Sequence, residues 1–246
     1  MNVSRPKHYY KSKKDTRKDS AILEAIKAVA IDFPSYGYRR ITAALAREGM
    51  VVNHKKVYRI MSQNGILCSI RRSYKHTTNS NHDMAKYPNL VKNLVPVRLN
   101  QVWHADITYL RFAASFAYLA AIIDGLSRKA VGYAIGKTLS PALTILALKD
   151  AIGSRETVDL IHHSDQGFQY CSSRYIEILK ENGIVISMSD KANPYDNAKM
   201  ESFFRTLKVE EVYMGEYNTY EDVLFSIPYF IEEVYNKKRL HSSLSC

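Results

Sequence analysis

The sequence lacks any apolar run long enough to cross a membrane. A membrane-spanning helix needs roughly 18 or more consecutive apolar residues, and no segment approaches that length. The first residues are basic but are not followed by the apolar stretch of a signal peptide. We therefore expect a cytoplasmic protein without a membrane partner.

Cysteine is also scarce in this chain. The three cysteines, Cys68, Cys171 and Cys246, lack the paired spacing of a zinc site and are too few for a disulfide framework. This scarcity is typical of a protein that works in a reducing compartment.

Acidic residues are scarce in the first part of the chain. Residues 1–100 hold 20 Lys and Arg against 6 Asp and Glu, whereas residues 101–246 hold 15 against 18. A basic composition alone is weak evidence of nucleic-acid binding. This one-sided distribution, however, favours an N-terminal region that binds nucleic acid, joined to a C-terminal domain with a different role.

Changes in composition divide the chain into four segments. Residues 1–18 are polar and basic without periodicity and predict a flexible tail, whereas residues 19–67 carry helical patterns. Residues 68–95 are rich in Asn, Ser and basic groups and predict a linker. Residues 96–246 form the remaining and largest domain.

Residues 19–67 predict a small all-α domain of three short helices. The first begins near Ser20 and ends at Pro34, the second stops at Gly49, and the third begins after Asn53, a good N-cap residue. The last two form a helix-turn-helix unit, whose second helix would meet DNA with its first residues. The candidate DNA contacts are the basic side chains Arg39, Arg40, His54, Lys55, Lys56 and Arg59. The alternative is a helical linker with a solvated basic face.

Residues 96–246 predict an α/β domain. The expected strands are 101–111, 117–124, 130–135, 160–163 and 184–187, and the expected helices are 141–152, 174–182, 197–212 and 220–235. The first three strands are close enough in sequence for an antiparallel meander. The order β-β-β-α-β-α-β-α-α predicts a mixed five-stranded sheet flanked by helices, as in ribonuclease H. Pro228 predicts a kink or a break in the last helix.

Three acidic residues stand at positions that suit a metal site. Asp106 interrupts an alternating strand, where an unpaired carboxylate is costly. Asp165 follows a short strand, and Glu201 lies in a helical run that begins further on, with 35 residues between these two acids. Two acids on strands and one on a helix can converge into an oxygen-rich site for Mg²⁺ or Mn²⁺. Two such ions can hold the attacking and leaving oxygens of a phosphodiester in line.

Several polar residues near these acids are candidate DNA contacts. Lys208 lies seven residues after Glu201, on the same helix face. Asn197 lies one turn before Glu201, where it could orient substrate. Either Asp196 or Asn197 could serve as the N-cap of this helix. His163 and Gln166, which lie on either side of Asp165 in the sequence, are the remaining candidate DNA contacts near the acids.

For several other residues in the same segments, a role other than DNA contact is considered. His162 and His163 could bind zinc, but adjacent strand residues point to opposite faces, so both cannot easily reach one ion. One of the two is expected to touch substrate or to support a ligand. Asp124 is expected to be a surface residue, and Phe203 and Phe204 are expected to lie in the core.

Four segments of the chain read WHADIT, HHSDQGFQY, NPYDNAKMESFFRTLK and YNKKRLHSSL. As a set they resemble the integrase-type transposases of insertion sequence family three, specifically their second-frame (OrfB) product. The earlier segment YGYRRITAALAREGMVVNHKKVYRIM resembles the helix-turn-helix that precedes the core in this family. The resemblance covers about residues 35–246.

The resemblance implies a retroviral-integrase-like, ribonuclease-H-like core in which Asp106, Asp165 and Glu201 form the catalytic triad around a metal pair. It implies hydrolysis of a phosphodiester at the transposon end and strand transfer by the freed 3′-OH. The implied partners are double-stranded DNA (terminal repeats and target), further copies of the chain in a homo-oligomer on that DNA, and a first-frame (OrfA) segment. The implied location is the bacterial cytoplasm, with the nucleoid when bound to DNA.

Two departures from the family pattern leave alternatives open. The chain stops at HSSLSC, where family members usually continue, and the first-frame segment is expected to be missing upstream. A truncated, catalytically inactive copy that only binds DNA is the first alternative, and a nuclease for RNA–DNA hybrids is the second. The intact acids favour an active enzyme, and the basic helix-turn-helix favours duplex DNA.

Overall fold

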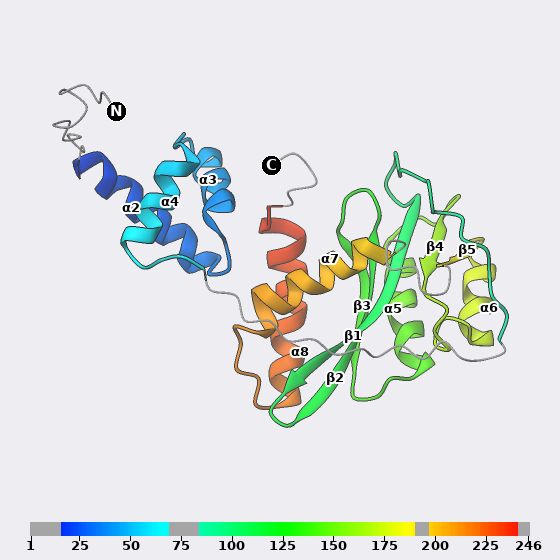
Figure 1. The fold of residues 1–246 in the computed structure, drawn as a ribbon. Helices are drawn as coiled ribbons and strands as arrows, with labels where there is room; N and C mark the ends of the chain where they lie inside the picture. Colours follow the sequence, from blue (N-terminus) through cyan, green and yellow to red (C-terminus); the bar gives the residue numbers. More distant parts are fainter. Residues whose placement is uncertain (1–15, 69–83, 190–196, 241–246) are drawn as a thin grey trace, which may run out of the picture. The chain divides into compact units, whose positions relative to one another are not determined.

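The computed structural model describes residues 16–68, 84–189 and 197–240 of the 246-residue chain. Contacts divide the chain into two compact units, Met1–Ile70 and Arg71–Ser245 (Figure 1). Within the described ranges, no helix is long and apolar enough to cross a membrane.

The first unit contains three helices, α2 (Thr16–Asp32), α3 (Tyr38–Arg47) and α4 (His54–Gln63). The predicted start of the third helix at Asn53 is confirmed, because its side-chain oxygen accepts a hydrogen bond of 2.8 Å from the Lys55 N–H. The apolar face of each helix is buried. The core residues include Ile26, Ile41, Leu45, Val57 and Met61.

The second unit is built on a five-stranded sheet. Its strands are β1 (Val102–Phe112), β2 (Ser115–Asp124), β3 (Ala130–Gly136), β4 (Ile161–Ser164) and β5 (Val185–Met188). Their order is β3-β2-β1-β4-β5. β1, β2 and β3 pair antiparallel as the predicted meander, whereas β4 is parallel to both β1 and β5. β1 is therefore the central strand and has a partner on each side.

Helices cover both faces of this sheet (Figure 1). They are α5 (Pro141–Ser154), α6 (Ser173–Glu181), α7 (Ala198–Leu207) and α8 (Tyr220–Tyr229). One core joins Ala105 of β1 to α5 and α6, and a second core joins Leu110 of β1 to α7 and α8. Residues of a strand alternate between its two faces, so β1 contributes to both cores. The predicted mixed sheet flanked by helices is confirmed.

Two of the predicted helices change their hydrogen-bonding pattern partway. α7 passes into a π-helix, η2 (Lys208–Val212), and α8 passes into another, η3 (Phe230–Lys238). The second change follows Pro228, which has no backbone N–H to donate to the preceding turn. The predicted kink or break is thus a change of helix type.

The later part of the predicted linker packs against the sheet. The Leu90 N–H donates to the Ser187 hydroxyl at 2.9 Å, and the Met188 N–H donates to the Pro88 carbonyl at 3.3 Å. Since Ser187 and Met188 belong to β5, this part of the predicted linker is attached to the sheet. The remainder of the linker, at 69–83, most of the predicted tail and the final HSSLSC lie outside the described residues.

The segment after α8 protects one edge of the sheet. Asn236 Oδ1 accepts a hydrogen bond from the Ala130 N–H, and Asn236 Nδ2 donates to the Ala130 carbonyl, both at 2.9 Å. The Asn236 side chain thereby satisfies the backbone N–H and carbonyl of Ala130 on the edge strand β3, as a neighbouring strand would. The adjacent Tyr235 is buried against Phe203 of α7, with ring centroids 4.8 Å apart. The start of the YNKKRLHSSL segment is therefore structural.

Candidate active site

Asp106 lies in the middle of β1 with both carboxyl oxygens hydrogen-bonded. Oδ1 accepts a bond of 2.7 Å from the Ile107 N–H, and Oδ2 accepts one of 2.9 Å from Asn197 Nδ2. Burial, reinforced by the charges of Asp165 and Glu201, raises the pKa of Asp106 to about 8. At neutral pH this carboxyl holds a proton unless a cation replaces it.

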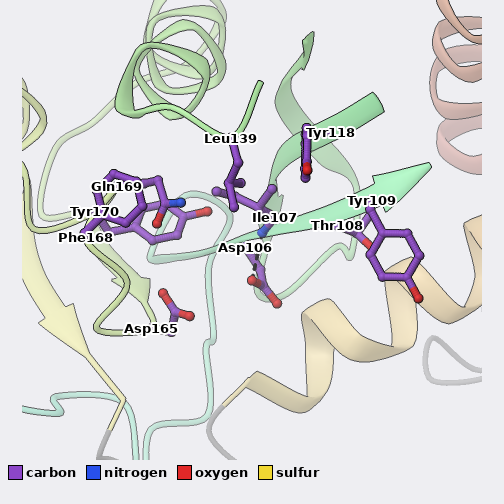
Figure 2. Close-up of a pocket in the computed structure, with 10 residues that line it drawn as sticks. All are labelled: Asp106, Ile107, Thr108, Tyr109, Tyr118, Leu139, Asp165, Phe168, Gln169 and Tyr170. Carbon is purple, nitrogen blue, oxygen red and sulfur yellow. Dashed lines mark hydrogen bonds between the residues drawn. The ribbon is translucent and has the colours of Figure 1, made fainter. Parts of the chain in front are cut away.

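Asp165 is brought beside Asp106 by the parallel pairing of β4 with β1, in which His163 lies opposite His104. Figure 2 shows both carboxylates facing the same space. Asp165 Oδ1 accepts a hydrogen bond of 2.9 Å from the Gly167 N–H. A Cβ at position 167 would lie 2.8 Å from this oxygen, so the loop can close on the carboxylate only because glycine has no side chain.

Glu201 lies in the first turn of α7 and is exposed. The opposite face of α7 is anchored in the core, where Phe203 and Phe204 are buried as predicted. Because the charge of Glu201 contributes to the raised pKa of Asp106, the third carboxylate lies within electrostatic reach of the first.

The three carboxylates do not form a compact metal-binding group. Across residues 16–68, 84–189 and 197–240, no three His, Cys, Asp or Glu side chains lie close enough to hold an ion. The surroundings of Asp106 nevertheless fit a divalent cation. Asn197 Oδ1 is buried beside it and has no hydrogen-bond partner in the described part of the chain. A hard cation accepts carboxylate and amide oxygens as ligands, so it would satisfy both groups.

A pocket opens beside the two aspartates (Figure 2). Its walls come from β1, β2 and the loop after β4, and they include Tyr109, Tyr118 and Phe168. The pocket is therefore acidic at one end and aromatic around it. A phosphate could enter its acidic end only if a cation offset the carboxylates.

Lys208 lies near the carboxylates, at the junction of α7 and η2. Its Nζ is 4.2 Å from the centre of the Tyr109 ring. Burial lowers the pKa of Lys208, and the negative charge of Asp106 opposes that shift. The structure thus brings Lys208 within electrostatic reach of Asp106, while its contact with DNA stays a prediction.

Asn197 occupies the N-cap position of α7, but its side chain does not cap the helix. It donates to Asp106 instead. Asn197 is thus the N-cap residue by position, while its side chain has another partner. Asp196, the other N-cap candidate, lies outside the described residues. The Asn197 side chain links the start of the helix that carries Glu201 directly to β1.

The two adjacent histidines have different partners, as strand alternation predicted. His162 shares a hydrogen bond of 2.9 Å with the Tyr175 hydroxyl, whereas His163 Nδ1 lies 2.9 Å from Ser187 Oγ. His163 has no exposed surface. A DNA contact does not fit a ring that is fully enclosed, so the prediction for His163 is corrected to a packing role.

Two other polar residues are held by the fold. Gln166 Nε2 donates to the Ser189 carbonyl at 3.0 Å, which fixes its amide against the backbone. Asp124, expected at the surface, is only 2% exposed. Its carboxylate accepts hydrogen bonds from the N–H groups of Asn100, Leu126 and Ser127. The expectation for Asp124 was wrong because the carboxylate satisfies backbone donors of the turn after β2 and of the segment before β1.

The six basic candidates of the helix-turn-helix unit fall into two groups. Lys56 and Arg59 form ion pairs of 2.8 and 2.7 Å with Asp19 of α2, and both interactions lower the pKa of Asp19. Arg40 is partly buried over the Tyr36 ring. These three side chains are partly buried, whereas Arg39 is exposed although it donates a hydrogen bond of 3.2 Å to the Tyr38 hydroxyl. The exposed candidates are Arg39, His54 and Lys55.

Two contacts that hold the end of α7 were not predicted from the sequence. The first is the Tyr109 ring beneath Lys208. The second is the bidentate ion pair of Arg239 with Glu210, at 2.8 and 2.9 Å. Periodicity identifies Tyr109 only as a strand residue. For Arg239 the available signal was its place in the YNKKRLHSSL segment. The sequence of that segment does not predict which acidic residue Arg239 pairs with.

Family models match most of the chain. An HTH-like domain matches residues 17–74. An integrase core domain matches residues 96–194, and a second integrase core domain model matches residues 182–245.

The chain is also similar to proteins of insertion sequences. It is 40% identical to the Insertion element IS600 uncharacterized 31 kDa protein of Shigella sonnei, over 85% of this chain and 78% of that protein. It is 38% identical to the Transposase for insertion sequence element IS904 of Lactococcus lactis subsp. lactis (strain IL1403), over 90% and 88%. It is 34% identical to the Transposase InsF for insertion sequence IS3A of Escherichia coli (strain K12), over 84% and 73%. Among solved structures, it is similar to the catalytic core domain of BIV integrase, with 21% identity and a TM-score of 0.45, over 58% of this chain and 87% of that one.

Proposed function

Because this chain belongs to the IS3-type transposases of insertion sequences, with their HTH-like and integrase core domains, we propose that Asp106, Asp165 and Glu201 are its catalytic residues. The activity of the family is DNA transposition. The observation that carries the proposal is the aspartate pair formed by Asp106 on β1 and Asp165 directly after the neighbouring parallel strand β4. The pair faces one pocket, and Asp106 in it has a pKa of about 8. Such a pair ionises fully only beside a cation.

The proposed reaction consists of two phosphoryl transfers at this site. Water attacks the phosphorus at the transposon end, the bond to the 3′ oxygen breaks, and that oxygen leaves as a 3′-OH. The freed 3′-OH then attacks a phosphodiester of the target DNA and displaces the target's own 3′ oxygen. Each step exchanges one P–O bond for another, so no covalent bond to the protein forms.

Proteins with an integrase core domain are metal-dependent. We propose Mg²⁺ or Mn²⁺, as a pair of ions held by the three carboxylates, which would supply a Lewis acid for the phosphate and for both reacting oxygens. Asn197 keeps the Asp106 carboxyl oriented toward that site. Lys208 contacts a phosphate oxygen of the DNA next to the reacting bond.

The HTH-like and integrase domains imply DNA binding. The finer partners are proposals: terminal repeats and target DNA, a homo-oligomer assembled on paired ends, and a first-frame (OrfA) segment. The proposed place of action is the bacterial cytoplasm, at the nucleoid.

Strand cleavage is expected to fall about a hundredfold or more in Glu201→Gln, because the neutral amide is a weaker ligand for a hard cation. The assay uses a labelled duplex that carries the end of the transposon, with Mg²⁺ or Mn²⁺, and it measures nicking and joining. Glu177→Gln, the same change at an exposed position of α6, is expected to cut like wild type.

The same assay tests the alternative of an inactive DNA-binding protein. If wild type and Glu201→Gln bind the duplex equally and neither cuts it, the proposed catalytic role is wrong for this chain. Adding the first-frame segment then shows whether a missing partner caused the loss. Equal cutting by both would remove Glu201 from the site.

DNA affinity is expected to depend on the exposed basic residues of the first unit rather than on the paired ones. Arg39→Met should weaken binding and reduce the slope of log affinity against log salt by about one, because a phosphate contact is lost. Arg59→Met should instead lower the unfolding temperature, because it removes a partner of Asp19. Fluorescence anisotropy and thermal unfolding measure the two effects, with Lys27→Met on α2 as control. A larger loss of affinity in Arg59→Met than in Arg39→Met would contradict this assignment.

A further inference from the structure

We propose that Tyr109 is a positioning residue for Lys208, whose ammonium group it holds on its ring face, next to Asp106, for contact with a DNA phosphate. The inference rests on the proposed function, because it requires that Lys208 contact DNA.

The geometry is that of a cation–π pair inside the candidate site. Lys208 Nζ lies 4.2 Å from the centre of the Tyr109 ring, well within the distance of about 6 Å at which the ring face attracts a cation. Tyr109 is on β1, three residues after Asp106, and lines the same pocket (Figure 2). One strand therefore carries both the acid and the support for the lysine.

The Tyr109 ring is itself held in place. The ring of Phe116, on β2, meets it edge to face, with centroids 5.6 Å apart and planes at 85°. The two rings are diagonal neighbours in the antiparallel register, because Tyr109 lies opposite Tyr118 and Phe116 lies two residues before Tyr118 in β2. The platform beneath Lys208 is therefore part of the sheet rather than of a loop.

Lys208 needs such a support. Its side chain is partly buried, so it has lost part of its water, and burial lowers its pKa. An aromatic face replaces some of that lost solvation, and the pair is stronger when it is partly desolvated. A lysine that is already held in one conformation loses less freedom when a phosphate binds. The ring thus increases the affinity of Lys208 for DNA without touching DNA.

The test uses the full chain and a labelled duplex of arbitrary sequence, in a chelator so that no strand is cut. Anisotropy gives the affinity over a series of salt concentrations. Lys208→Met should reduce the salt slope by about one. Tyr109→Leu should weaken binding about fivefold, and Tyr109→Phe, which keeps the ring, should stay within about twofold of wild type. Lys137→Met, at the exposed cation 4.6 Å from the Tyr220 ring, is the matched control and should bind like wild type.

The double variant Tyr109→Leu/Lys208→Met decides whether the ring acts through the lysine. If it does, the double variant binds no more weakly than Lys208→Met alone. If Tyr109→Leu lowers the DNA affinity by the same factor in wild type and in Lys208→Met, the ring does not act through the lysine and the inference is overturned. If Lys208→Met changes neither affinity nor slope, the proposed DNA contact of Lys208 fails as well. Thermal unfolding of each variant excludes a loss of fold as the cause.

Discussion

Asp106→Asn is expected to make the metal-free protein more stable at pH 8 while it abolishes strand cleavage. The pKa of Asp106 is about 8 in the folded chain, against an ordinary value of 3.8. Between these two values the folded state keeps a proton that the unfolded state has released, so stability falls as the pH rises through that window. An amide does not ionise and therefore escapes this loss.

The gain in stability should be several kcal/mol at pH 8, because each pKa unit corresponds to about 1.4 kcal/mol. For a chain of this size we expect an unfolding temperature about 6–12 °C above that of wild type at pH 8, and little difference at pH 4. The new amide nitrogen replaces the oxygen that accepts from Asn197 Nδ2, so the Asn197 amide must turn over and accept through Oδ1, which is buried and unbonded within the described residues. The measurement is thermal unfolding in a chelator at several pH values, beside Asp159→Asn at an exposed position.

Cleavage by Asp106→Asn should fall by about a thousandfold or more, since a metal ion contributes several kcal/mol of transition-state stabilisation. In wild type, the affinity for Mg²⁺ should rise with pH up to about 8, because the ion must displace the proton of Asp106. A variant that cuts DNA normally would remove Asp106 from the catalytic site. An unfolding temperature that differs from wild type equally at pH 4 and pH 8 would mean that its carboxyl is not the desolvated group.

Patterns of local origin were predictable from the sequence. The alternation around Asp106, the short strand before Asp165 and the helical spacing after Glu201 predicted the elements that carry the three acids. Asn53 predicted the start of α4, since an N-cap needs only its own next turn. Periodicity and capping depend on residues that are close together in the chain, so they can be recognised from a single sequence without a structure.

The partners of polar side chains could not be predicted in the same way. Lys56 and Arg59 are basic residues at the start of a recognition-type helix, but Asp19, which pairs with both, is far away in sequence. His163 precedes an acid of the site by two residues, yet its ring is fully buried and its Nδ1 lies 2.9 Å from Ser187 Oγ of another strand. Whether a charged or polar group meets DNA or another part of the fold is decided by tertiary packing, which these patterns do not encode.

Arg239→Leu is expected to be strongly destabilising, with a fall in the unfolding temperature of about 6–15 °C. Arg239 Nε and Nη2 donate to the two carboxylate oxygens of Glu210 at 2.8 and 2.9 Å, and both side chains are less than a tenth exposed. Removing one member of a buried ion pair deprives the other charge of its bidentate partner, at a cost of about 3–5 kcal/mol. Arg239→Lys should also lose stability, because an ammonium cannot reproduce the two-pronged contact.

The double variant Glu210→Leu/Arg239→Leu should regain most of that stability, since apolar side chains can replace a buried ion pair at little net cost. The cleavage activity of this double variant shows whether the ion pair positions Lys208 or only neutralises buried charge. Glu210 lies in η2, two residues after Lys208, so the pair ties the segment that carries this lysine to the end of η3. If stability returns but cleavage does not, the ion pair sets the position of Lys208 beside the acids. If both return, packing alone holds η2 in place, and the pair contributes only the neutralisation of two charges that the fold has buried.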